Sequence, residues 1–87
     1  MSKITLQIIT PEDMVYDGLC YSVNLPGSQG RFEVLEGHMN MVSSLEDGVV
    51  EIRELDGRTI KRLEVSDGFA DVSPKRCIVM IESARAI

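Results

Sequence analysis

Residues 49–65, VVEIRELDGRTIKRLEV, carry the clearest structural signal of this sequence. Two runs rich in branched apolar residues, 49–55 and 58–65, flank the pair Asp56-Gly57. An Asp-Gly pair between two extended runs is typical of a β-hairpin, because glycine adopts the positive φ that a tight hairpin turn needs. The stretch therefore predicts two antiparallel strands that meet at Asp56-Gly57.

Alternating runs before this hairpin predict further strands. Residues 3–9 and 19–25 alternate in side-chain type, which is the period of a half-buried strand. Ile4, Leu6 and Ile8 are expected on one face of the first strand, and Leu19, Tyr21, Val23 and Leu25 on one face of the second.

Shorter runs complete the expected set of strands. Residues 32–35 and 39–45 predict one strand each. The run 77–81 is apolar at both parities, which predicts a central strand that is buried on both faces. The tail 82–87 contains helix formers but is too short to show a helical period.

Turn signals recur about every ten residues. Asp-Gly pairs begin at Asp17, Asp47 and Asp67, and a turn is expected at Ser73-Pro74. Short strands separated in this way predict an all-β fold, an antiparallel β-sandwich of about eight to ten short strands. The core is predicted to contain Ile4, Leu6, Ile8, Val23, Leu25, Val34, Ile52, Val65, Val79 and Ile81.

The composition excludes several classes of protein. With 87 residues, 44% of them hydrophobic and 26% charged, the chain is typical of one globular domain spanning residues 1–87. A formal net charge of −5 with few aromatic residues disfavours nucleic-acid binding. No run approaches the roughly 20 apolar residues of a membrane span, and no signal-peptide pattern precedes the first strand.

The sequence shows no catalytic or metal-binding pattern. The single histidine, His38, has no Gly-x-Ser-x-Gly or cysteine motif beside it. The carboxylates do not follow zinc or calcium ligand spacing. Cys20 and Cys77 lack CxxC spacing and are expected to be buried, reduced thiols. The sequence predicts no catalytic residue, no cofactor and no metal, and it favours an interaction module.

The segment 25–41, LPGSQGRFEVLEGHMNM, is the first candidate for a contact surface. It places Gly27, Gly30 and Gly37 around a short apolar strand, and it contains His38 directly after Gly37. Clustered glycines indicate positive φ or close approach to another surface. A shaped loop on a rigid sheet is a common place for binding function.

Four segments in register resemble a known family. They are ITPEDMVYDG (9–18), LPGSQGRFEVLEGH (25–38), DGVVEIR (47–53) and VSDGFADVSPKRCIVM (65–80). Together they resemble the N-terminal β-sandwich domain of the epsilon subunit of F-type ATP synthase, over residues 4–84. The resemblance implies a domain without catalytic residues at the foot of the central stalk, with one side against the gamma subunit and one end against the ring of c subunits.

The implied function is that of a non-catalytic rotor subunit, which couples proton flow to ATP synthesis. The implied location is peripheral, on the cytoplasmic side of the bacterial inner (plasma) membrane. The alternatives are a generic β-sandwich adaptor of another complex and a small hydrolase or isomerase that depends on His38.

The family pattern also implies two sets of contact residues. The set expected to meet the c ring is Ser28, Gln29, Gly30 and Arg31, with Glu33 as a nearby carboxylate. The set expected to meet gamma is Thr10, Gly37, His38, Met39 and Met41.

Some positions depart from the family pattern. The family commonly has an acidic residue at position 31, a glycine at Glu33, a proline at Glu36 and Ala-Pro at Met39-Asn40.

The resemblance further implies a C-terminal pair of helices that can inhibit ATP hydrolysis. Since these 87 residues lack that pair, they are expected to couple without regulating.

Overall fold

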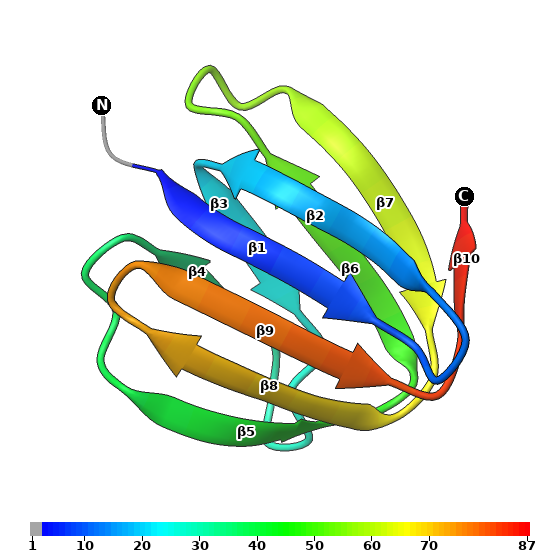
Figure 1. Ribbon diagram of the computed structural model, residues 1–87. Helices are drawn as coiled ribbons and strands as arrows, with labels where there is room; N and C mark the ends of the chain where they lie inside the picture. Colours follow the sequence, from blue (N-terminus) through cyan, green and yellow to red (C-terminus); the bar gives the residue numbers. More distant parts are fainter. Residues whose placement is uncertain (1–2) are drawn as a thin grey trace.

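The computed structural model describes residues 3–87 as ten strands in two facing sheets (Figure 1). The strands follow one another through short turns, as the regular spacing of turn signals predicted. Their bounds are β1 (Ile4–Ile9), β2 (Met14–Cys20), β3 (Ser22–Leu25), β4 (Phe32–Leu35), β5 (Met41–Leu45), β6 (Gly48–Arg53), β7 (Thr59–Val65), β8 (Gly68–Ser73), β9 (Arg76–Ile81) and β10 (Ala84–Ala86).

Each sheet contains five strands. Sheet A has the order β2-β1-β9-β8-β5 and sheet B the order β10-β7-β6-β3-β4. Neighbouring strands are antiparallel with one exception, the central pair β1 and β9, which is parallel. In Figure 1, sheet A lies in front of β3 and β6 of sheet B. The predicted antiparallel β-sandwich is confirmed, with this single parallel pair.

The core lies between the sheets and follows the two-residue period of the strands. β1 buries Ile4, Leu6 and Ile8 completely, while the alternate residues point outward. All ten predicted core residues are confirmed, since each is at most 4% exposed. Leu45, Val50, Leu63, Ala70, Val72 and both cysteines complete this core.

The predicted hairpin is confirmed with a longer turn. β6 and β7 pair from Gly48↔Val65 to Arg53↔Thr59, with a register shift at Ile52/Arg53. Beyond the strands the amide of Glu54 donates to the carbonyl of Arg58 at 2.9 Å, so the turn is closed by a bond outside the regular ladder. Gly57 has φ +85°, the positive value expected of the Asp-Gly pair.

The prediction of one strand over residues 19–25 is wrong. β2 ends at Cys20 in sheet A and β3 begins at Ser22 in sheet B, so the chain changes sheets at Tyr21. Leu19, which was expected on the same face as Val23 and Leu25, is 59% exposed, whereas Cys20 is fully buried. The pair Asp17-Gly18, predicted to form a turn, lies within β2.

Two further expectations need correction. β9 is central, but only Cys77, Val79 and Ile81 face the core, and Met80 is 44% exposed. The run 77–81 is therefore buried on one face. The tail is not helical, because Ala84–Ala86 adds a fifth strand to sheet B by pairing with β7. Pairing with a neighbouring strand outweighs the weak helical propensity of so short a segment.

Both cysteines are free and buried, as predicted. Burial and, to a smaller extent, the nearby Glu54 carboxylate raise the pKa of the Cys20 thiol to about 11. Burial likewise raises the pKa of the Cys77 thiol to about 12. Both thiols are thus neutral, as core packing requires.

Candidate functional site

The loop between β3 and β4 joins the two sheets at one end of the sandwich. The amide of Ser28 donates to the carbonyl of Ser44 at 3.0 Å, and the amide of Glu46 donates to the carbonyl of Pro26 at 2.9 Å. An isolated bridge pairs Gly27 with Leu45. The loop leaves β3 of sheet B and is thereby bound to the end of β5 in sheet A. It is held in shape, as its glycines predicted.

The two glycines of this loop are needed for different reasons. Gly30 has φ +123°, a conformation that L side chains rarely adopt, and the space beside it is open. Gly27 has no positive φ, but a Cβ there would lie 2.6 Å from the Gly30 carbonyl oxygen and 2.8 Å from the Phe32 ring. Gly30 is required for its backbone angle and Gly27 for the space around it.

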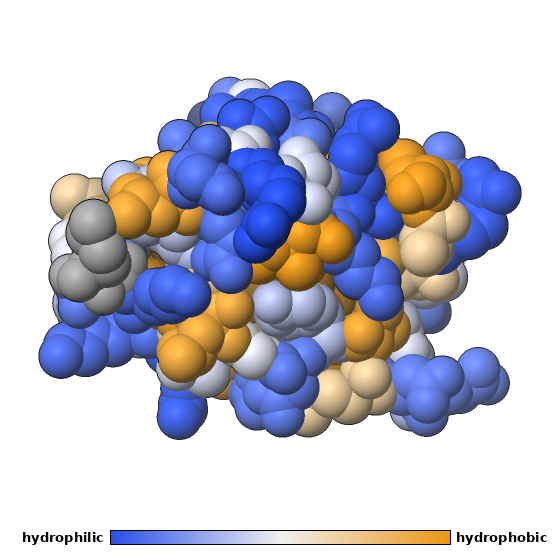
Figure 2. Space-filling model, turned by 90° about the horizontal axis from the view of Figure 1, so that it is seen from above, coloured by the Kyte–Doolittle hydropathy of each residue, from blue (hydrophilic) through white to orange (hydrophobic). Residues whose placement is uncertain are grey.

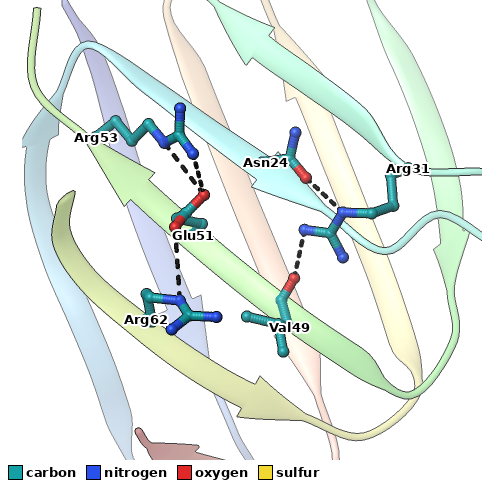
Figure 3. A network of polar contacts seen from close by, with 6 residues as sticks. All are labelled: Asn24, Arg31, Val49, Glu51, Arg53 and Arg62. Atoms are coloured by element: carbon teal, nitrogen blue, oxygen red, sulfur yellow. Dashed lines mark hydrogen bonds and ion pairs between the residues drawn. The ribbon is translucent and has the colours of Figure 1, made fainter. Parts of the chain in front are cut away.

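The Arg31 side chain lies on sheet B (Figure 3). Its Nε donates to Asn24 Oδ1 at 2.7 Å, and its Nη2 donates to the carbonyl oxygen of Val49 at 2.6 Å. The guanidinium group thus connects the loop to β3 and β6.

The other residues expected to meet the c ring lie close by. Ser28, Gln29 and Gly30 are exposed at the tip of the loop, and Glu33 is exposed on β4, opposite Asn24. Ser28 also lines a shallow depression with acidic residues of neighbouring turns, Glu46 and Asp67 among them. The structure brings this set together on one end of the sandwich.

This end, which we call the loop end, is acidic. It is formed by the turns 10–13, 26–31, 46–47, 66–67 and 82–83. Arg31 is the only basic residue in these turns, and its guanidinium group is turned onto sheet B. The carboxylates there are Glu12, Asp13, Glu46, Asp47, Asp67 and Glu82.

The residues expected to meet gamma do not form one cluster. Thr10 belongs to the loop end, where its hydroxyl accepts from the amide of Asp13 at 3.1 Å. Gly37, His38 and Met39 belong to the opposite end, where the amide of Gly37 donates to the carbonyl of Pro74. Met41 begins β5, opposite Val72, and packs against the core. The length of sheet A separates Thr10 from the others.

His38 makes a local contact within its own loop. Its Nδ1 lies 2.9 Å from the carbonyl oxygen of Met39, which can only accept, so the Nδ1–H donates. The next residue, Met39, is 72% exposed. Among residues 3–87, no group of three or more His, Cys, Asp or Glu side chains is arranged to hold a metal ion.

The outer face of sheet A presents an apolar row that sequence reasoning missed. The strand register aligns Ile9 of β1, Met80 of β9 and Phe69 of β8 side by side. Phe69 is 55% and Met80 44% exposed. A shallow depression of about 350 Å³ lies between this row and the loop end. It is lined by these three residues together with Asp67 and Glu82. The apolar parity of 77–81 was the available signal, but it was assigned to burial within the fold.

The outer face of sheet B is covered by paired polar groups instead. Glu51 accepts from Arg53 at 2.5 Å and lies 3.5 Å from Arg62 (Figure 3). Arg85 forms an ion pair with Glu64 on the neighbouring strands. Figure 2 looks from above onto an edge of the sandwich, where apolar side chains reach the surface in separate patches between charged ones. The two sheets therefore present chemically different outer faces.

Residues 3–87 match the family described as the ATP synthase Delta/Epsilon chain, beta-sandwich domain. The ATP synthase epsilon chain of Sulfurimonas denitrificans is 39% identical over 87 residues, which are 100% of this chain and 66% of that relative. The epsilon chain of Campylobacter fetus is 38% identical over 84 residues, 97% of this chain and 64% of its own length. This chain thus spans slightly less than two thirds of these relatives.

A solved structure has the same fold. A chain in the cryo-EM structure of the Euglena gracilis mitochondrial ATP synthase, OSCP/F1/c-ring, superposes with a TM-score of 0.89 at 20% identity. The superposition covers 99% of this chain and 54% of that one.

Among residues 3–87, the structure contains no helix with the length and hydrophobicity of a membrane span.

Proposed function

This chain belongs to the family of ATP synthase delta/epsilon β-sandwich domains, and we propose that it acts as a rotor element of the proton-translocating ATP synthase. In this role it links the gamma subunit to the c ring, couples proton flow to ATP synthesis and catalyses no reaction itself. It sits peripherally, on the cytoplasmic side of the bacterial plasma membrane. The epsilon chains among its relatives and the c-ring complex that contains its structural neighbour support this proposal.

The contrast between the two outer faces carries the proposal. On sheet B, ion pairs within the chain join Glu51 to Arg53 and Arg62, and Glu64 to Arg85. The row Ile9, Met80 and Phe69 on sheet A remains open to water, although burying it would be favourable. A domain with paired charges on one face and an exposed apolar row on the other is suited to being held on one side by a larger partner.

In this proposal the gamma subunit lies along the outer face of sheet A. The face extends from Thr10 at the loop end to His38 and Met39 at the opposite end. The apolar row lies at the Thr10 end of this face, so a partner must continue along the length of sheet A beyond the row to contact His38 and Met39 as well. The carboxylates of Asp67 and Glu82 beside the row favour a partner surface with basic residues around an apolar anchor.

The loop end meets the c ring in the same proposal. Ser28, Gln29 and Gly30 project there, with Arg31 and Glu33 behind them. A rigid contact is favoured because the loop is bound to both sheets. The surrounding carboxylates favour polar c-subunit loops that carry positive charge.

Gamma binding is tested with two substitutions in the apolar row, Phe69→Asp and Met80→Asp. Leu55→Asp is the control, because Leu55 has the same exposed fraction as Met80 but lies in the β6–β7 turn. Each row variant should bind purified gamma about tenfold more weakly or worse, as expected for an anchor residue, while the control binds normally. Calorimetric titration gives the affinities, and circular dichroism verifies folding.

A failure of the wild-type chain to bind any gamma subunit at micromolar concentration would overturn the proposed function. Wild-type affinity in the Phe69→Asp/Met80→Asp double variant would remove the gamma interface from sheet A. Restored ATP-driven proton pumping in an epsilon-depleted synthase would support the coupling role.

A further inference from the structure

We infer that Arg31 is a positioning residue, whose guanidinium group fixes the loop tip by binding β6 and does not present its charge to a partner. We call the two hydrogen bonds from Arg31, to Asn24 and to Val49, the clamp. Its existence is argued from this local geometry, whereas its purpose rests on the proposed function, in which residues 28–30 contact the c ring.

The clamp occupies the place where a strand ladder stops. β3 pairs with β6 only from Ser22↔Arg53 to Asn24↔Glu51. Gly27 then pairs with Leu45 of sheet A, so the part of β6 before Glu51 has no strand paired to it on that side. The Val49 carbonyl on this open edge needs a donor, because an unpaired backbone acceptor is costly to cover.

Arg31 supplies that donor together with a second bond. Its Nη2 donates to the Val49 carbonyl oxygen while its Nε donates to Asn24 Oδ1, so one planar group connects the last pair of the ladder to Val49, two residues before Glu51 (Figure 3). Two donors at fixed spacing are a property of guanidinium. A lysine ammonium has one nitrogen, so it cannot reproduce both contacts from the same backbone position.

The same loop is tied to sheet A by its backbone. The amide of Ser28 binds the Ser44 carbonyl, and the amide of Gly30 binds the Gly27 carbonyl within the loop. With Arg31 bound to β6, the tip is fixed to both layers of the sandwich. Since Glu51 is already occupied by Arg53 and Arg62, this nearby carboxylate does not draw Arg31 away.

Arg31→Lys separates the effect of the guanidinium geometry from that of charge, because lysine keeps the positive charge and loses the planar group with donors on several nitrogens. Arg85→Lys is the matched control, since Arg85 lies on the same sheet and is paired with Glu64 of β7, and neither residue belongs to the loop 26–31. The first measurement is amide hydrogen exchange at Ser28 and Gly30 in the chain without any partner. Arg31→Lys and Arg31→Gln should each accelerate exchange there by about tenfold, and Arg85→Lys should not.

The second measurement is affinity for purified c ring. We expect Arg31→Lys to lose as much affinity as Arg31→Gln, and more than its change in melting temperature explains when compared with Arg85→Lys. Asn24→Ala should reproduce part of the effect and add little to it in an Arg31→Gln background, because both changes break the same contact.

Wild-type exchange and wild-type ring affinity in Arg31→Lys, with a loss only in Arg31→Gln, would overturn the inference and assign the role to charge. Unchanged exchange in Arg31→Gln would overturn it as well. Amide hydrogen exchange is measured without a partner. A wild-type chain that fails to bind the ring would therefore contradict the proposed function, whereas the exchange rates alone would still test the clamp.

Discussion

The backbone amide of Ser83 donates to the hydroxyl of Ser66 at 2.8 Å, and the two hydroxyl oxygens lie 3.0 Å apart. The amide of Ser66 in turn donates to the Ser83 carbonyl at 3.1 Å. The short strand β10 is therefore fastened to the turn between β7 and β8 as well as to β7 itself.

Ser66→Ala should loosen β10 without disturbing the rest of the fold. The substitution removes the acceptor of the Ser83 amide, so we expect hydrogen exchange at Ala84 and Ala86 to accelerate several-fold. Ser73→Ala is the control, because the Ser73 hydroxyl donates to the carbonyl of Arg76, at the start of β9 and away from β10. Equal exchange of β10 in both variants would show that pairing with β7 is enough to hold it.

Val79→Ala should destabilise the domain by about 1 to 3 kcal/mol. Val79 is fully buried in the middle of β9, and its loss leaves a cavity between the sheets. Met80→Ala, one residue further on, should cost less because its side chain is 44% exposed. Urea unfolding compares the two, and an equal or larger loss for Met80 would contradict the assignment of the inner face.

Gly30→Val and Gly27→Ala should each lower the free energy of unfolding by about 1 kcal/mol or more. The first forces a branched side chain to adopt φ +123°, and the second places a Cβ against the Gly30 carbonyl and the Phe32 ring. Gly18→Ala is the control, because its Cβ would meet only the Tyr16 side chain, at an ordinary 3.6 Å. Thermal melting that is the same in all three variants would remove both requirements.

Alkaline pH should destabilise the fold through its thiols. Folding raises the pKa of Cys20 from about 9 to about 11 and that of Cys77 to about 12, so above pH 9 the native state retains protons that the unfolded state releases. The stability contribution is therefore complete below about pH 9 and is lost as the pH rises through the native pKa values. Urea unfolding at successive pH values should show this decline, and a Cys20→Ala/Cys77→Ala variant should show less of it.

The cysteine assignment has a second readout. A thiol reagent should not label the native chain near neutral pH, because both thiols are buried and protonated. Both should react once the chain is unfolded. Rapid labelling of the native chain would contradict the burial of Cys20 and Cys77.

Local alternation predicted most of the fold, because one face of each strand packs on one core. It failed at Tyr21, where the chain changes sheets and the inward parity shifts from Cys20 to Val23. Alternation within a run cannot show which sheet a strand joins. β10 was missed because its partner, β7, determines its conformation more than its own residues do.

The site was predicted as far as local shape determines it. The glycines around residues 26–31 indicated a held loop, and the structure shows one. The alignment of Ile9, Met80 and Phe69 depends on the register of three strands that are distant in the sequence. The position of the Arg31 guanidinium depends on where the β3–β6 ladder ends. Neither relationship follows from a local pattern.

The parallel pairing of β1 with β9 sets the order in which this fold can be completed. Thr5 lies opposite Arg76, so the centre of sheet A joins the two ends of the chain. On the ribosome, which extends the chain from its N-terminus, β1 and β2 emerge early but wait for β9 before β8 and β5 can join their sheet. Contacts this distant in sequence also slow folding. Until β9 emerges, the nascent chain leaves one backbone edge of β1 unpaired, which makes this the interval in which chaperone binding would matter most.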